Sequence, residues 1–421
     1  MAKRSKSVRR RRRRRILFGL EIILLLVLVG GLFLYATVNE KMNKLQIDNS
    51  TGDVEVNENV IGSTTLKGFT NIALFGVDIG EGDIKSGRNS DTTIIASINN
   101  ETKEVKLVSL YRDTYLNIGD DQYTKCNAAY SAGGPQQSMS MINTNLDLNI
   151  TNYVAVDFKA LSTVIDLLGG LDVEMSYEEI VHTNNYCVGT SEYTGMDYTP
   201  IDLPVVPDDM NESMIIGTYH LNGTQATSYC RIRKTNGWDM KRTERQRYII
   251  SLMVEKAKKA KLSTLNEIMD EVFPMIYTDF SKSELIKLGT GIIAYQLGDT
   301  SGFPKSHMMG PEVKNAIDLD CVVPTTLEAN VKYLHEFLFN DGNYEPSEIV
   351  KQRSDYIANH TGFGKSYVGE ELKKYITEES SESEYYEEDY TDEDYSEDYS
   401  EDYSDDSYDY EDYEDVGAYL E

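Results

Sequence analysis

The 421-residue sequence has little of what many enzyme active sites are built from. It holds five histidines that stand apart from one another, so a histidine-based metal cluster and a Ser-His-Asp triad both lack a sequence signature. No G-x-S-x-G or G-x-x-x-x-G-K-[ST] motif occurs, which argues against an α/β-hydrolase nucleophile and a P-loop. The glycines between Gly76 and Gly87 do not fit a dinucleotide fingerprint. The chemistry of this chain must therefore come from other residue types.

Cysteine is equally scarce. The sequence has no C-x-x-C pair, which argues against a zinc ribbon and a thioredoxin-type site. The four cysteines are Cys126, Cys187, Cys230 and Cys321. Their even number is compatible with two disulfides and equally with four buried thiols. Cys230, beside Arg231, is the one candidate for a covalent nucleophile.

Charge is distributed very unevenly along the chain. Residues 1–15 contain ten lysines and arginines and no acid, whereas residues 377–421 contain 22 acids, ten tyrosines and no base. This acidic tail shows no apolar period, and we expect it to be disordered because it cannot bury enough surface to offset its ordering entropy. It is interpreted as a solvated polyanion, or alternatively as a binder of cations or basic surface proteins.

Residues 16–38 form the one long apolar run, with Glu21 as its only charge. Twenty-three residues at about 1.5 Å each span a bilayer core, and the run is too long for a signal peptide and lacks a cleavage motif. The arginines over 9–15 hold the N-terminus in the cytoplasm by the positive-inside rule, although a nucleic-acid-binding arm is the alternative. We therefore expect a single-pass cell-membrane protein whose chain after about residue 39 is extracellular.

The region outside the membrane predicts an α/β fold. Residues 39–68 are polar without a period and are interpreted as a stalk. Strands are predicted over 71–78, 92–99, 105–111, 153–158 and 171–175, and helices over 136–148, 158–170, 223–231, 239–261, 265–277, 283–296 and 326–339. No element is predicted over 176–217. Alternating strands and helices favour a central mixed sheet flanked by helices. We place the folded domain at 69–345 and a C-terminal extension at 346–376.

Acids and one arginine follow or precede three of these strands. Asp78 follows the first strand, Asp91 precedes the second, and Arg112 and Asp113 follow the third. If the strands are neighbours, these side chains gather near one edge of the sheet, where α/β proteins bind ligands. Two carboxylates at a shared cavity suit Mg²⁺, so Asp78 and Asp91 are the predicted metal ligands. The alternative is that aspartates end strands because they favour turns.

A basic stretch offers a second candidate site. Residues 231–247 hold seven bases and two acids, within a region, 16–376, whose net charge is −17. Arg242, Arg245 and Gln246 share one face in the first turns of a predicted helix, where cations oppose the helix dipole. A phosphate or pyrophosphate would compensate this arrangement. Alternatively, the face is solvated and paired with Asp239 and Glu244.

Taken together, four blocks resemble the LytR-CpsA-Psr family of wall glycopolymer transferases. They are NIALFGVD, GRNSDTTIIASINNETKEVKLVSLYRDTYL, YHLNGTQATSYCRIRK and DMKRTERQR, in this order behind one predicted transmembrane helix. The resemblance implies an α/β domain with an apolar pocket for a polyprenyl chain. It also implies a phosphotransferase-type ligase that moves a teichoic-acid-like or capsular glycopolymer from a polyprenyl-pyrophosphate carrier to peptidoglycan, assisted by Mg²⁺. No nucleic-acid partner is expected.

The resemblance also assigns roles to individual residues. Asp78 and Asp91 match metal-associated aspartates, and the residues that match pyrophosphate contacts are Arg112, Arg231, Arg233, Arg242 and Gln246. Tyr111 stands where the family commonly has proline. We expect Arg112 and Arg242 to act in catalysis, with Asp113 or Asp239 as the base for the acceptor hydroxyl. A polyprenyl-pyrophosphate hydrolase and a non-catalytic, wall-polymer-binding regulator remain the alternative functions.

Overall fold

The computed structural model describes residues 39–48, 52–77, 89–207, 211–233, 238–291 and 294–376. The predicted transmembrane helix, the arginine run, the acidic tail and Asp78 lie outside these residues. Among the described residues, no helix has both the length and the apolar character that crossing a bilayer requires.

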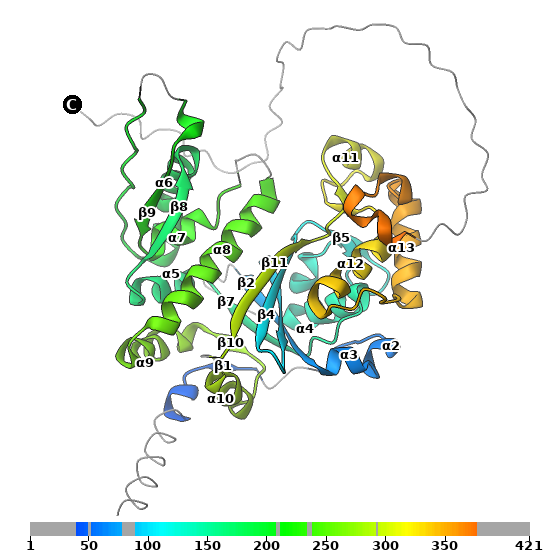
Figure 1. The fold of residues 1–421 in the computed structure, drawn as a ribbon, viewed down its shortest axis with the longest axis horizontal. Coiled ribbons are helices and arrows are strands. Elements are labelled where there is room, and N and C mark those ends of the chain that lie inside the picture. Colours follow the sequence, from blue (N-terminus) through cyan, green and yellow to red (C-terminus); the bar gives the residue numbers. More distant parts are fainter. Residues whose placement is uncertain are drawn as a thin grey trace, which may run out of the picture. The chain divides into compact units, whose positions relative to one another are not determined.

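A mixed seven-stranded sheet forms the centre of the fold, which confirms the predicted α/β architecture (Figure 1). The pairs β2–β3 and β3–β4 are antiparallel, whereas β7 and β11 run parallel to β2 and β4. The strands in spatial order are β1 (Gln46–Ile47), β10 (Tyr277–Thr278), β7 (Asn152–Val156), β2 (Phe69–Val77), β3 (Ser90–Asn99), β4 (Glu104–Leu110) and β11 (Gln296–Phe303). The three predicted neighbours β2, β3 and β4 are therefore adjacent.

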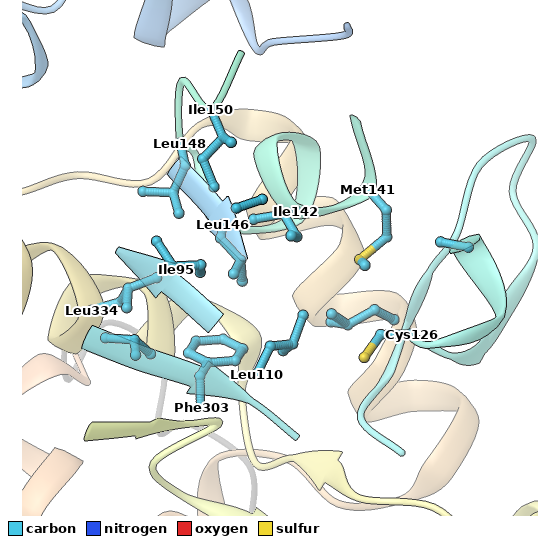
Figure 2. Packing of buried hydrophobic residues seen from close by; sticks show 14 of the residues in the cluster. Ile95, Leu110, Cys126, Met141, Ile142, Leu146, Leu148, Ile150, Phe303 and Leu334 are labelled. Carbon is cyan, nitrogen blue, oxygen red and sulfur yellow. The ribbon is translucent and has the colours of Figure 1, made fainter. Parts of the chain in front are cut away.

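Both faces of the sheet are covered by helices. The alternation of apolar residues along β2 places Ala73 and Phe75 in the main core and Ile72 and Leu74 on the opposite face. Helices α4 (Ala128–Leu146), α12 (Leu327–Phe339) and α13 (Glu348–Thr361) cover the main-core face, and α8 (Trp238–Lys259) and α10 (Lys282–Thr290) contribute to the other. Figure 2 shows the main core, where strand residues such as Ile95 lie against Leu146 of α4 and Leu334 of α12.

A second, smaller core lies beside the sheet. It is built from the paired strands β8 (Leu171–Ser176) and β9 (Ile216–Leu221) and from helices α5 (Phe158–Leu167), α6 (Tyr177–Thr194) and α7 (Gly223–Tyr229). Helix α8 joins the two parts, because Ile249 belongs to the second core while Ile250 packs on the sheet. The remaining elements include α2 (Glu58–Ile61), α3 (Thr64–Lys67), α9 (Leu262–Glu271), α11 (Pro311–Ile317) and the pairs β5 (Tyr115–Asn117) with β6 (Tyr123–Lys125) and β12 (His307–Met308) with β13 (Val323–Pro324).

The folded domain extends beyond the predicted boundaries at both ends. The predicted stalk supplies β1 to the sheet and Val60 and Leu66 to the main core. The predicted C-terminal extension supplies α13, whose Val350 and Ile357 are buried in the same core. These apolar residues are too few and too widely spaced among polar ones to show a period in the sequence.

Several predicted elements have different bounds or a different type. The stretch 176–217 contains α6, which begins with a capping box between Ser176 and Glu179. The helix predicted over 283–296 ends at Thr290, and β11 follows as an edge strand. The helix predicted over 265–277 is α9, which ends at Glu271 because a short 3₁₀ turn and β10 follow.

All four cysteines are free and buried, which excludes disulfides among them. Burial raises the pKa of Cys230 to about 12, so its thiol stays protonated at neutral pH and is a poor nucleophile.

The buried His335 makes stability depend on pH. Its Nε2–H donates to the carbonyl of Leu146 at 3.0 Å, its ring stacks on Tyr344 with a centroid distance of 3.5 Å, and burial lowers its pKa to about 4. Below pH 6.5 the His335 imidazole is therefore protonated in the unfolded chain, whereas in the folded chain it stays neutral until about pH 4. We expect His335 to cost up to about 3 kcal/mol of stability as pH falls through this window.

Urea unfolding of wild type and His335→Gln between pH 7 and 4.5 tests this expectation. Glutamine keeps the donor to Leu146 without titrating, so the stability of the variant should fall less on acidification. Parallel pH profiles of the two proteins would contradict it.

Candidate active site

A β-bulge positions Asp91 at the edge of the sheet. In the pairing of β2 with β3, Gly76 lies opposite Thr92 and Val77 opposite Ser90, so Asp91 is the extra residue between them. A bulge of this kind redirects a side chain and releases its main-chain groups from the ladder. The carboxylate and the carbonyl of Asp91 are both used by arginines, as described next.

Arg112 reaches Asp91 from the end of β4. Its Nη1 donates to Asp91 Oδ1 at 2.7 Å, and its Nε lies 3.7 Å from Asp113 Oδ2 and 4.0 Å from Asp239 Oδ1. Burial by itself would lower the pKa of Arg112, but the carboxylates of Asp113, Asp91 and Asp239 outweigh it and raise that pKa. Arg112 is therefore a firmly charged guanidinium.

Arg242 approaches the same aspartate from the first turns of α8. Its Nη2 donates to the main-chain carbonyl of Asp91 at 2.8 Å and lies 3.0 Å from Asp239 Oδ1, one helical turn earlier. The side chain is only 4% exposed. Desolvation, strengthened by the nearby Arg233 and Arg112, lowers the pKa of Arg242 to about 10. The group is still cationic at neutral pH, yet its charge is incompletely compensated.

Further charged side chains complete the site. Arg233 Nη2 lies 3.8 Å from Asp91 Oδ1, and Lys125 Nζ lies 3.4 Å from Asp113 Oδ1. We call the group of four cations and three carboxylates the arginine cluster; its members are Asp91, Arg112, Asp113, Lys125, Arg233, Asp239 and Arg242. Lys125 was not predicted, because β6 lies outside the family-like blocks and its sequence carries no motif.

Three buried polar atoms of the arginine cluster have no hydrogen-bond partner among the described residues. Two are donors, the Nε atoms of Arg112 and Arg242, and one is an acceptor, Asp239 Oδ2. Leaving such a group buried and unpaired costs about 1–3 kcal/mol, and more when it is charged. Unpaired guanidinium donors are suited to phosphate oxygens, and the unpaired carboxylate oxygen is suited to a hydroxyl.

The structure separates Arg231 and Gln246 from their predicted companions. Arg231 donates to Thr190 Oγ1 at 2.8 Å and lies over the rings of Phe158 and Tyr186, at 4.9 and 5.8 Å from their centroids. These contacts place Arg231 on the side of the second core, whereas Arg233 reaches Asp91. Gln246 lies one turn beyond Arg242, and its Nε2 donates to the carbonyl of Cys230 at 3.4 Å.

The structure describes one of the two predicted metal ligands. Asp91 lies in the arginine cluster, whereas Asp78 lies outside the described residues. Within the described ranges, no group of three or more His, Cys, Asp or Glu side chains has the arrangement of a metal site. The ion pairs of Asp91 with Arg112 and Arg233 both reach Oδ1. Among the described residues, only the other oxygen of Asp91 lies outside these ion pairs, so a cation such as Mg²⁺ would need further ligands such as phosphate oxygens.

The sequence that builds this site matches a known protein family. The sequence model of the LytR_cpsA_psr family matches residues 29–297, more than half of the chain. This protein belongs to the LytR-CpsA-Psr family. All seven residues of the arginine cluster lie inside the matched segment, whereas α11, α12 and α13 follow it.

Two curated LytR-CpsA-Psr relatives are named as transferases. The polyisoprenyl-teichoic acid–peptidoglycan teichoic acid transferase TagU of Enterococcus faecalis is 33% identical over 279 residues, which cover 65% of this chain and 80% of the relative. TagV of Bacillus subtilis, with the same transferase description, is 28% identical over 338 residues, which cover 77% and 78%. A solved protein from Streptococcus agalactiae shares the fold, with a TM-score of 0.51 and 19% identity over 68% of this chain and 92% of that one.

Tyr111, the residue before Arg112, is held in place by β11. Its N–H donates to the carbonyl of Phe303 at 2.9 Å, a bond that proline cannot form. Its ring lies over Gly302 of β11, where an added Cβ would come within 2.1 Å of the phenolic oxygen. Glycine at 302 is thus required by the position of Tyr111.

We expect Gly302→Ala to displace Tyr111 and to destabilise the protein by about 1–3 kcal/mol, the usual cost of overpacking. Because Tyr111 precedes Arg112, the affinity of the site for pyrophosphate should fall as well. Thermal unfolding and pyrophosphate titration measure the two effects. Gly189→Ala is the matched control, since a Cβ there meets nothing within 4 Å. Equal behaviour of the two variants would contradict the expectation.

Proposed function

We propose that this protein is a membrane-anchored transferase that moves a teichoic-acid-like or capsular glycopolymer from a polyprenyl-pyrophosphate carrier to peptidoglycan. Membership of the LytR-CpsA-Psr family and the transferase names of the two curated relatives support the reaction class. The observation that carries the proposal is that the Nε donors of Arg112 and Arg242, in one cluster, both lack a hydrogen-bond partner among the described residues.

The arginine cluster suits the charge changes of this transfer. An acceptor hydroxyl oxygen attacks the phosphorus linked to the sugar, the bond from that phosphorus to the bridging oxygen breaks, and polyprenyl phosphate leaves with the electron pair. Negative charge grows on the departing phosphate as the bond breaks. Arg112 and Arg242, supported by Arg233, hold donors in fixed positions for that charge, so they stabilise the transition state more than the ground state.

Asp239 is the better of the two candidates for the base. Its Oδ2 has no hydrogen-bond donor among the described residues, whereas Asp113 is held by Lys125 on one oxygen and faces Arg112 with the other. In this proposal the acceptor hydroxyl donates to Asp239 Oδ2 and transfers its proton there as the new bond forms.

Mg²⁺ belongs to the proposal as an assisting cofactor. Asp91 would hold it together with Asp78 and the phosphate oxygens, and the ion would supply further neutralisation of the pyrophosphate charge.

The proposed topology follows from the segment before the described domain. Residues 16–38 would span the membrane with the basic N-terminus in the cytoplasm and the catalytic domain outside, where a lipid-linked polymer and peptidoglycan are both accessible. The partners are then the polyprenyl-linked glycopolymer, the peptidoglycan acceptor and the membrane itself.

We expect Arg112→Ala and Arg242→Ala each to lower the rate of transfer by about 10²–10³, the typical cost of removing one such donor. The measurement is transfer of polymer from a polyprenyl-pyrophosphate donor to peptidoglycan fragments, over time, with and without the acceptor. Lys241→Ala is the matched control, because this exposed residue on the same helix pairs only with Glu244 among its described contacts.

If transfer persisted in the double variant Arg112→Ala, Arg242→Ala, the assigned site would be wrong. Phosphate release that ignores the acceptor would favour a polyprenyl-pyrophosphate hydrolase at the same residues instead. Turnover in neither assay, with polymer still bound, would favour the non-catalytic regulator.

We expect EDTA to lower the transfer rate and added Mg²⁺ to restore it. Asp91→Asn should raise the Mg²⁺ concentration needed for half-maximal rate, because the neutral amide binds the cation more weakly. The same substitution also weakens the ion pair with Arg112, so pyrophosphate affinity without metal serves as the control. If EDTA left the transfer rate unchanged, the cation would have no part in the mechanism.

A further inference from the structure

The described chain begins against helix α9. Its first residues directly follow the predicted membrane span. Lys41 and Lys44 both reach the carboxylate of Asp270, near the end of α9, at 2.5 and 2.6 Å. Lys282, at the start of α10, donates to the side-chain oxygen of Asn43, and Figure 1 shows both helices beside this blue segment. These contacts hold α9 close to the point at which the chain would leave the membrane.

Helix α9 keeps its apolar side chains accessible. Leu262, Leu265 and Met269 follow one another at helical spacing and form an apolar stripe. No residue of α9, or of the 3₁₀ turn Phe273–Met275 that follows it, is buried, and Leu262 is 76% exposed. None of these side chains belongs to a core cluster of the described residues. The stripe is therefore only partly covered by the rest of the domain.

A basic corner, residues 256–262, leads into the stripe. Its sequence, KAKKAKL, holds four lysines and no acid. The dipole of α8 favours cations in its last turn, which accounts for three of the lysines but not for Lys261, the N-cap residue of α9. Lys259 and Lys261 are exposed, and neither forms an ion pair with another described residue. Their ammonium groups are available to an anionic partner.

Lysines beside an accessible apolar stripe suit the surface of an anionic bilayer. Phosphate headgroups attract the ammonium groups, while apolar side chains enter the boundary between headgroups and acyl chains. The distances agree with this partner. Lys41 is three residues beyond the predicted span, about 5 Å along a helix, and the ten residues of α9 extend about 15 Å from its partner Asp270. The whole of α9 is thus within reach of the membrane surface.

We propose that α9 and the basic corner dock on the headgroups of anionic phospholipids and hold the domain against the membrane. The inference rests on the topology within the proposed function, and it adds the docking surface and the class of lipid. A polyprenyl chain is the other apolar ligand of that function. The exposure of Leu262 beside lysines without ion pairs favours an open, phosphate-rich surface over an enclosed chain.

The test uses the full-length chain in nanodiscs of phosphatidylcholine, with or without phosphatidylglycerol. A polarity-sensitive fluorophore is attached to Leu262→Cys, and the burial of all four native cysteines protects them from the label. We expect the emission to shift to shorter wavelength in the anionic discs, and added salt to reverse part of the shift by screening. The same label on Ile349→Cys is the matched control. Ile349 is an exposed apolar residue of α13, which Figure 1 shows across the sheet from α9, so its label should not respond.

Charge variants of the labelled chain test the role of the lysines. The double substitution Lys259→Gln, Lys261→Gln should abolish most of the lipid-dependent shift, and because both residues are exposed the fold should be intact. The double substitution Lys314→Gln, Lys365→Gln removes two exposed lysines elsewhere and should leave the shift unchanged.

Equal emission of the Leu262→Cys label in the two kinds of disc would overturn the proposal, as would a shift that survives the Lys259→Gln, Lys261→Gln substitutions. If polyprenyl phosphate in neutral discs produced the same shift, α9 would bind the lipid carrier instead. A chain that did not enter the discs at all would refute the proposed topology and this proposal with it. Transfer that persisted in the arginine variants, together with a lipid-dependent shift, would refute the assigned active site and support the docking of α9.

Discussion

The burial of one guanidinium, that of Arg242, constrains the whole site. Removing a charge from water is costly, and the neighbouring Arg112 and Arg233 oppose it further. The carbonyl of Asp91 and the carboxylate of Asp239 compensate part of this cost. The carbonyl is available because the bulge at Asp91 takes it out of the strand ladder. The remaining positive charge of Arg242 attracts an anion, and its position is fixed before any ligand binds.

The position of the site follows from the two cores. Helix α8 packs its middle on both, through Ile249 on one side and Ile250 on the other, and this fixes its N-terminal turns beside the ends of β3 and β4. An arginine of a helix and one that follows a strand thereby meet at one aspartate. Helix α8 holds Arg242, and the turn that directly follows β4 holds Arg112, at their distances from Asp91.

Much of this could be predicted from local sequence patterns. The strand runs and the basic stretch predicted the sheet centre and placed Asp91, Arg112, Asp239 and Arg242 in candidate sites. The bulge could not be predicted, since it depends on how two strands pair. Arg231 lies away from the arginine cluster because it donates to Thr190 of α6, a tertiary contact that the R-x-R spacing does not show. Helix α6 was missed because its capping box is not followed by an apolar period. Lys125 belongs to the arginine cluster only through its tertiary contact with Asp113, which no local sequence pattern shows.

The four buried, free thiols bear on how the domain comes to be folded. Its stability comes from two apolar cores and from charges paired across them, and no covalent cross-link closes any loop within the described residues. Folding therefore consumes no oxidant and needs no disulfide isomerase. The native structure of the described residues therefore depends on no disulfide, so a reductant would leave both apolar cores intact.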